Sequence, residues 1–148
     1  MTLQKQTRPV EYATVKPEWI DLYGHMNMAY YVLILDELGH RILEGFGLGE
    51  TYTRRENRGL FTVEANLKYQ REVKAGDRLR VELTVLGHDA KRLRTRVELF
   101  NLEQDYLSAT MEQTAVNVDL DSRRVVPFSA ATLQALKSLS ASLGSLRG

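Results

Sequence analysis

The sequence predicts an α+β domain in which an antiparallel sheet wraps around one long central helix. Three observations predict it: a strand-like segment near the start, a segment over residues 28–46 that is apolar on most of a helical circumference, and a change to period-two alternation after Gly59. A helix that is apolar on most sides has to be covered by the sheet that follows it. We expect one domain over residues 1–148, with its core at about 10–127.

The first part of the chain supplies the first strand and the helix. Residues 10–15 have strand-like composition, and Pro17 ends them. The helix is expected from residue 28 to about residue 46, and to be mostly buried, because its apolar residues recur at three- and four-residue steps. The stripe consists of Tyr31, Leu35, Leu38, Ile42 and Phe46, widened by Val32, Leu33, Ile34 and Leu43. The polar residues 50–58 form a loop or a short helix.

Four strands and a second long helix are expected next. The first strand alternates, with an apolar face of Phe61, Val63, Ala65, Leu67 and Tyr69. The second has its apolar face at Leu79, Val81, Leu83 and Val85, and two more strands follow at about 93–102 and 106–120. Ser129 can cap a final helix that extends to about residue 144, with a stripe at Leu133, Leu136, Leu139 and Leu143. One sheet leaves open edges, so we expect a homodimer or a homotetramer.

Composition excludes several classes of protein. The formal net charge is +1, from 20 basic and 19 acidic residues, so no nucleic-acid or membrane partner is expected. Cysteine is absent, which excludes disulfides, cysteine-ligated metal and a cysteine nucleophile, and fits a reducing compartment. Residues 1–9 lack the apolar stretch of a secretory signal, and no segment approaches a membrane span. We therefore expect a cytoplasmic protein.

A polar turn directly before the long helix is the strongest candidate for a functional site. It reads Asp21-Leu22-Tyr23-Gly24-His25-Met26-Asn27. The first backbone N–H groups of a helix lack partners within the helix and carry partial positive charge. The turn thus brings a carboxylate, an imidazole and an amide next to free donors, a combination that can act on a carbonyl group. Purely structural roles also explain these residues, with Asp21 in an Asx turn and Asn27 as the helix cap.

Other titratable residues carry weaker signals. A histidine that follows a glycine in a turn, as His25 does, either serves as an acid or base near neutral pH or orients a neighbour. His25 shows no ligand spacing with His40 or His88, so no metal site is expected. Three carboxylates are further candidates, and each can equally face solvent or a buried partner: Asp36, Glu37 and Glu64.

A basic stretch consists of Lys91, Arg92, Arg94 and Arg96, and its three arginines alternate onto one strand face. A solvated sheet surface explains such a stretch. Bidentate arginines there would also suit a phosphate group, and no glycine-rich phosphate loop competes for that role. The two interpretations remain open.

The turn and the order of the elements together resemble the hotdog-fold thioesterases of the 4-hydroxybenzoyl-CoA thioesterase type. In that family a strand leads through an Asp-containing turn into the central helix, as residues 21–27 do here. The next strand carries a Tyr and closes in a Gly-Asp turn, which residues 69–77 match. Four strings more specifically resemble the betainyl-CoA thioesterases of carnitine catabolism: Trp19-Ile20-Asp21, Gly24-His25-Met26-Asn27, Tyr30-Tyr31 and Asp89-Ala90-Lys91-Arg92.

The resemblance implies hydrolysis of a small acyl-CoA, with betainyl-CoA as the implied substrate, coenzyme A as part of that substrate, and no metal or other cofactor. It implies Asp21 as nucleophile or general base, the Met28 amide as oxyanion donor, and Asn27 and His25 as orienting groups. Aromatic faces bind quaternary ammonium groups, and six aromatic residues cluster around the presumed site in sequence: Trp19, Tyr23, Tyr30, Tyr31, Phe61 and Tyr69. The substrate-binding residues that we expect are Trp19, Tyr23, Tyr30, Glu64 and Tyr69. Those expected to bind CoA are Lys91, Arg92 and Arg94.

Two other functions stay open. A hotdog hydratase or dehydratase would use an acid–base pair such as Asp21 and His25 on the acyl chain. A non-catalytic module would bind acyl-CoA without turnover. A Ser-His-Asp hydrolase is disfavoured, because no Gly-x-Ser-x-Gly motif occurs.

Overall fold

The computed structural model describes residues 9–147, and the side-chain surroundings of residues 9–142. Within this range the strands are β1 (Val10–Thr14), β2 (Arg58–Tyr69), β3 (Arg78–His88), β4 (Arg92–Asn101) and β5 (Tyr106–Asp119). The helices are α1 (Met28–Gly45), α2 (Glu50–Glu56) and α3 (Ala130–Arg147), and a short 3-10 helix, η1 (Pro17–Trp19), precedes the polar turn. The predicted order of strand, long helix and four strands is confirmed.

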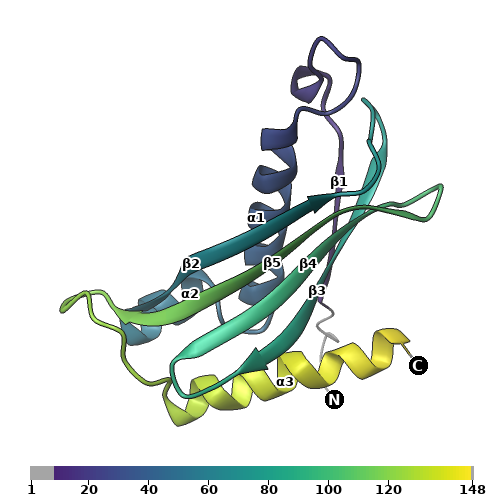
Figure 1. The fold of residues 1–148 in the computed structure, drawn as a ribbon. Coiled ribbons are helices and arrows are strands. Elements are labelled where there is room, and N and C mark those ends of the chain that lie inside the picture. The colour runs from purple at the N-terminus through teal and green to yellow at the C-terminus, as the bar shows by residue number, and fades with distance from the viewer. Residues whose placement is uncertain (1–8, 148) are drawn as a thin grey trace.

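Neighbouring strands are all antiparallel, and the sheet order is β1-β3-β4-β5-β2. Although β2 directly precedes β3 in the sequence, it pairs with β5 at the far edge of the sheet, from Arg58 opposite Asp119 to Tyr69 opposite Ala109. The outer edge of β2 therefore has no strand beside it among residues 9–147. In Figure 1 the sheet passes across α1, while α3 lies at the end of the sheet where β3 finishes.

The core lies between α1, one face of the sheet and α3. The buried apolar side chains that α1 adds to the core are Tyr31, Ile34, Leu35, Leu38 and Ile42. Leu79, Val81 and Leu83 of β3 are buried, as their alternation predicted. The hydroxyl of Ser129 accepts the N–H of Thr132 (3.2 Å), which confirms the predicted cap of α3. Leu136 and Leu139 of α3 are buried in the core, and the predicted stripe residue Leu143 lies outside the described side chains.

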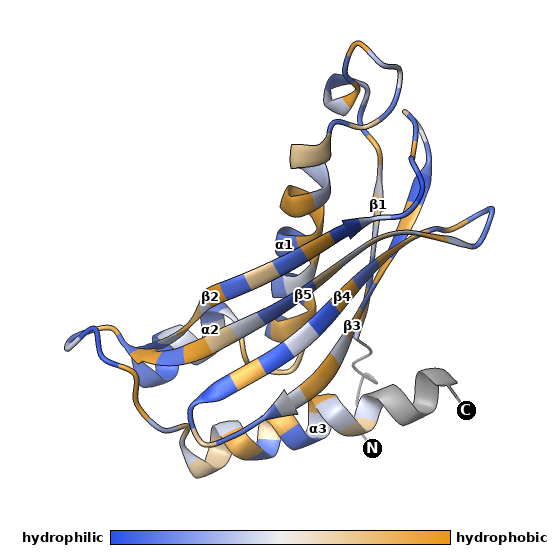
Figure 2. Ribbon diagram, viewed as in Figure 1, coloured by the Kyte–Doolittle hydropathy of each residue, from blue (hydrophilic) through white to orange (hydrophobic). Residues whose placement is uncertain are grey.

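One side of α1 is exposed, which corrects the expectation of a mostly buried helix. Met28, Val32 and Leu33 are 65%, 37% and 41% exposed. Val32 and Leu33 line a shallow groove with Ala65 and Met111 of the sheet. Hydrophobic segments recur along α1 in Figure 2. The apolar stripe of α1 is therefore wider than the sheet of one chain covers. None of the helices within residues 9–147 has the length and hydropathy needed to cross a membrane.

A β-bulge in β2 divides the predicted apolar face of that strand, of which Ala65, Leu67 and Tyr69 do lie on the α1 side. The register against β5 shifts between Thr62 and Glu64, so that Val63 is an extra residue. An extra residue moves all following side chains to the opposite face of the sheet. Ala65 therefore lies on the α1 side with Thr62, whereas Glu64 lies on the outer face. The prediction assumed an unbroken period of two.

Candidate active site

Asp21 lies in a tight turn that its own carboxylate holds together. Oδ1 accepts the backbone N–H of Tyr23 (2.9 Å), and Oδ2 accepts the side-chain amide of Asn27 (3.3 Å). Gly24 donates its N–H to the Asp21 carbonyl (3.1 Å) and has a φ of 84°, a conformation that glycine adopts far more readily than other residues. The Asx turn predicted for Asp21 is thus confirmed, and its carboxylate remains partly exposed.

The first turn of α1 leaves a backbone donor free. The side-chain oxygen of Asn27 accepts the N–H of Ala29 (3.0 Å), which confirms the predicted cap, and the Asn27 carbonyl accepts the N–H of Tyr30 (3.0 Å). The N–H of Met28 has no hydrogen-bond partner among residues 9–147. Since Asn27 also donates to Asp21, one side chain connects the carboxylate to the positive end of the helix dipole.

Contacts from other parts of the chain hold the segment between Asp21 and α1. Met26 is fully buried, and its N–H donates to the carbonyl of Val73 (3.0 Å). The N–H of Asn27 donates to the carbonyl of Trp19 in η1 (2.9 Å). The turn is therefore anchored on both sides, and its geometry depends on tertiary contacts as well as on its own residues.

His25 contacts a carboxylate that sequence reasoning missed. Its Nδ1 lies 3.2 Å from the Met26 carbonyl, and its Nε2 lies 3.8 Å from the Glu72 carboxylate. The ring also stacks on Tyr23, with 6.2 Å between centroids. Nothing in the local sequence distinguishes Glu72 from a solvated residue, because only the packing of the loop after β2 brings it to His25. Within the described residues, no hydrogen bond or ion pair joins the His25 ring to the Asp21 carboxylate.

Aromatic side chains gather around the turn, as predicted for most of them. Trp19 stacks on Tyr30, with 5.6 Å between centroids, and the Lys16 ammonium lies 5.4 Å from the centre of the Trp19 ring. Tyr23 is 75% exposed. Phe61 is an exception, since it lies near the start of β2 in a separate groove next to α2.

Tyr69 reaches the first residue of α1 from the end of β2. Its hydroxyl donates to the Met28 carbonyl (3.1 Å), and its ring packs edge-on against Tyr31 with 5.2 Å between centroids. The Tyr31 hydroxyl in turn accepts the N–H of Val73 (3.2 Å). Burial, partly opposed by that backbone hydrogen bond, raises the pKa of Tyr31, so its hydroxyl stays protonated at neutral pH.

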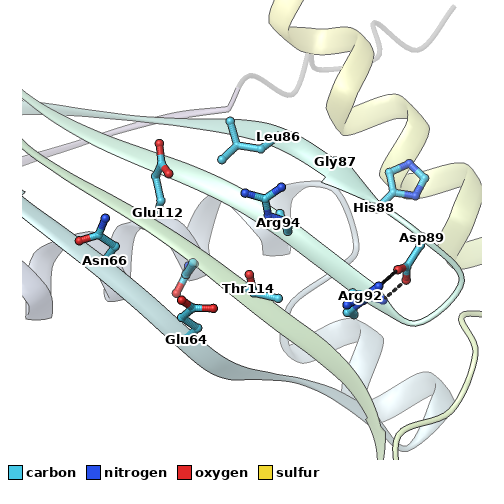
Figure 3. Close-up of a pocket in the computed structure, with 11 residues that line it drawn as sticks. Glu64, Asn66, Leu86, Gly87, His88, Asp89, Arg92, Arg94, Glu112 and Thr114 are labelled. Carbon is cyan, nitrogen blue, oxygen red and sulfur yellow. Dashed lines mark hydrogen bonds and ion pairs between the residues drawn. The ribbon is translucent and has the colours of Figure 1, made fainter.

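Arg92 and Arg94 lie with Glu64 in a groove of about 670 Å³ on the face of the sheet away from α1 (Figure 3). The backbone N–H of Lys91, followed by the Arg92 side chain, lowers the pKa of Asp89 to about 2. Asp89 is therefore ionised at neutral pH and pairs with Arg92 at 2.8 Å. Arg94 has no ion-pair or hydrogen-bond partner among the described side chains, which leaves its guanidinium available to an anion.

Three candidates lie apart from the turn within one chain. Lys91 lines a separate pocket beside the groove. Glu64 faces the groove, about 16 Å from Tyr69 by the rise of a strand, and on the opposite face of the sheet. Asp36 is about 12 Å along α1 from Met28 by the helical rise, where its carboxylate lies 3.4 Å from His40. None of the three therefore reaches Asp21 in a single subunit.

Comparisons with known proteins found similar sequences and similar folds. Residues 15–136 match the family model described as the thioesterase-like superfamily. A betainyl-CoA thioesterase of Pseudomonas aeruginosa is 34% identical over 125 residues, which are 84% of this chain and 79% of that protein. An L-carnitine dehydrogenase/betainyl-CoA thioesterase of Agrobacterium fabrum is 36% identical over 87% of this chain, which spans 26% of that longer protein. A Staphylococcus aureus protein solved in complex with CoA is similar with a TM-score of 0.85 and 25% identity, over 96% of this chain and 89% of that one.

Proposed function

Because the chain belongs to the thioesterase-like superfamily, we propose that it acts on a small acyl-CoA, which it hydrolyses to the free acid and CoA. Its sheet order and long central helix are those of the hotdog fold. The observation that carries the proposal lies at the start of α1, where Asn27 links the Asp21 carboxylate to a helix whose Met28 N–H is free. Hydrolysis of a thioester needs an attacking group and a donor to the developing oxyanion.

Asp21 can drive attack by two routes. Its carboxylate can take a proton from a water molecule whose oxygen attacks the thioester carbon. It can instead attack that carbon itself and form an acyl-aspartyl anhydride, which water then cleaves. In both routes the C–S bond breaks, CoA leaves as the thiolate, and water supplies the oxygen of the acid and the protons released. The hydrogen bond from Asn27 orients the carboxylate in either route.

The Met28 N–H is the proposed donor to the oxyanion. The N–H groups of Ala29 and Tyr30 are already bonded to Asn27, so they are less available to a substrate. One such donor is typically worth about 2.7–4 kcal/mol of transition-state stabilisation. His25 is proposed to shape the turn, since its ring contacts Met26 and Glu72.

We propose betainyl-CoA as the substrate, supported by the two betainyl-CoA thioesterase relatives. The trimethylammonium group of betaine is attracted to aromatic faces by about 0.5–2 kcal/mol per contact. Trp19 already has the Lys16 ammonium near its ring, and it stacks on Tyr30 beside the turn. Trp19, Tyr30 and the exposed Tyr23 are the residues that we propose to bind the acyl group.

A panel of acyl-CoA esters, with release of free thiol as the readout, tests both proposals. Betainyl-CoA is compared with tert-butylacetyl-CoA, in which a neutral carbon replaces the quaternary nitrogen. We expect kcat/KM to be about 2- to 30-fold higher for betainyl-CoA, the equivalent of one cation–π contact. Equal kcat/KM values for the two esters would reject betainyl-CoA as the substrate and leave the proposed hydrolysis standing. If no ester of the panel released thiol, the hydrolysis itself would be rejected. We propose that no metal or cofactor takes part, so EDTA should leave the rate unchanged.

Product analysis separates the remaining functions. A thioester that survives with a changed acyl chain would identify a hydratase or dehydratase. Tight binding of the ester without turnover would identify a binding module. The cytoplasmic location expected from the sequence stays a prediction.

Arg94→Ala is expected to raise KM for an acyl-CoA about tenfold and to leave kcat nearly unchanged, because a distant phosphate anchor binds the ground and transition states equally. The matching N-acetylcysteamine thioester lacks the phosphates, so its KM should not change. Arg78→Ala serves as the control variant, since Arg78 pairs with Glu103 outside the groove. An unaltered KM for the CoA ester would contradict this site. Lys91 and Arg92 are proposed as weaker contacts, Arg92 because Asp89 already neutralises it.

We also propose that two copies of the chain pair through the exposed side of α1 and the open edge of β2. The groove lined by Val32 and Leu33 runs along β2, so one partner can cover both features. An antiparallel pairing of the two β2 strands would bring the start of one strand beside the end of the other. Residues remote from Asp21 within a chain, such as Glu64, could then approach the site of the partner. Sedimentation measures whether the assembly stops at a dimer or continues to a tetramer.

A further inference from the structure

Tyr69 makes a contact that gives it a role other than the substrate binding expected from the sequence. Its hydroxyl donates to the carbonyl of Met28 at 3.1 Å, although the two residues are 41 positions apart. The N–H of the same Met28 is the proposed oxyanion donor. We propose that Tyr69 is a positioning residue, which fixes the first residue of α1 and thereby the direction of the Met28 N–H. This inference rests on the proposed function.

The neighbours of Met28 are held in other ways. The N–H of Met26 is bonded to Val73, and the N–H of Asn27 is bonded to Trp19. Met28 has no such bond on its own N–H, and its side chain is 65% exposed. Among the described residues, the Tyr69 hydroxyl is the one hydrogen-bonding group outside α1 that reaches Met28. It is therefore the contact best placed to restrain this residue.

The Tyr69 hydroxyl is itself held in place. Its backbone is paired with β5 opposite Ala109, and its ring packs edge-on against the buried Tyr31. Tyr31 is in turn fixed by the N–H of Val73. Because Tyr69 is 43% exposed, its hydroxyl can exchange this bond for one to water, and its loss should change folding stability little. The restraint therefore acts on local geometry more than on the fold.

The direction of the Met28 N–H matters most in the transition state. An oxyanion gains more from an aligned donor than the neutral carbonyl of the substrate does. An interaction made chiefly in the transition state changes kcat and leaves KM nearly unchanged. A side chain that only bound the acyl group would change KM instead.

The Tyr69→Phe variant tests this role, because it removes the hydroxyl and keeps the ring on Tyr31. We expect kcat to fall about fivefold, the size of one neutral hydrogen bond, with KM and the unfolding temperature unchanged. Tyr12→Phe is the matched control, since Tyr12 on β1 is 57% exposed and its hydroxyl has no hydrogen bond among the described residues. A rise in KM with unchanged kcat would overturn the positioning role.

A second readout needs no turnover. The chain has four methionines, Met1, Met26, Met28 and Met111, so ¹⁵N-methionine labelling yields a spectrum simple enough to assign with a Met28→Leu variant. Tyr69→Phe should shift the Met28 amide signal and leave the Met111 signal in place, and Tyr12→Phe should shift neither. An unmoved Met28 signal would overturn the inference. A shifted signal in a protein that hydrolyses no acyl-CoA would support the positioning contact and reject the reaction.

Discussion

Asp21→Asn is expected to lower kcat for the best acyl-CoA of the panel by about 100- to 10,000-fold, the range for loss of a general base. The asparagine oxygen can still accept the N–H of Tyr23, so the turn should keep its shape. A neutral amide, however, neither takes a proton from water nor attacks a thioester at neutral pH. Thiol release at saturating substrate measures the loss.

Asp77→Asn is the matched control for this substitution. The Asp77 carboxylate also accepts a backbone N–H within a turn, from Lys74 at 2.9 Å, but it lies outside the proposed site. We expect wild-type kcat for Asp77→Asn and unchanged thermal unfolding for both variants. If Asp21→Asn keeps the wild-type rate, the attacking role belongs to another group. Acid quenching followed by mass spectrometry separates the two routes, because only the nucleophilic route leaves an acyl group on the Asp21 peptide.

Leu33→Glu is expected to dissociate the proposed dimer and to remove most of the activity with it. Leu33 is 41% exposed on α1 and lines the groove beside β2. A carboxylate buried at an apolar interface without a partner costs several kcal/mol, so the dissociation constant should rise by at least about 100-fold. Analytical ultracentrifugation over a range of protein concentrations measures this change.

Val125→Glu is the control for the added charge. Val125 is 45% exposed, and it lies beside Lys91 and Val116 rather than on α1. We expect this variant to sediment like the wild type. A Leu33→Glu protein that still forms dimers would place the interface elsewhere. A monomer with full activity would show that one subunit holds a complete site.

Much of the fold could be predicted because its signals are local. The helix predicted from residue 28 ends at Gly45, and the alternation of Leu79, Val81 and Leu83 matches their burial in β3. A helix or strand places its side chains by a period of its own backbone, so the pattern is visible within a few residues. The Asx turn of Asp21 and the cap of Asn27 belong to the same class, since each side chain bonds to a backbone group two residues ahead.

The surroundings of the site could not be predicted in the same way. The contact of Tyr69 with Met28 and that of Glu72 with His25 join residues from different elements. Each depends on how β2 and the loop after it pass the start of α1. No local pattern in the sequence determines that packing. An alternating pattern predicts a strand, but it predicts neither the strand's pairing partner nor its register.

The sequence by itself determined the elements, the polar turn and the Asn27 cap at the start of α1, because these follow from backbone geometry and from neighbours along the chain. Only the tertiary structure decided that β2 pairs with β5, that Val63 forms a bulge, and that one side of α1 stays open. Strand pairing and bulges depend on the summed packing of distant residues. As a result of that packing, Phe61 and Glu64 lie away from the turn, and Tyr69 contacts the residue that follows it, Met28.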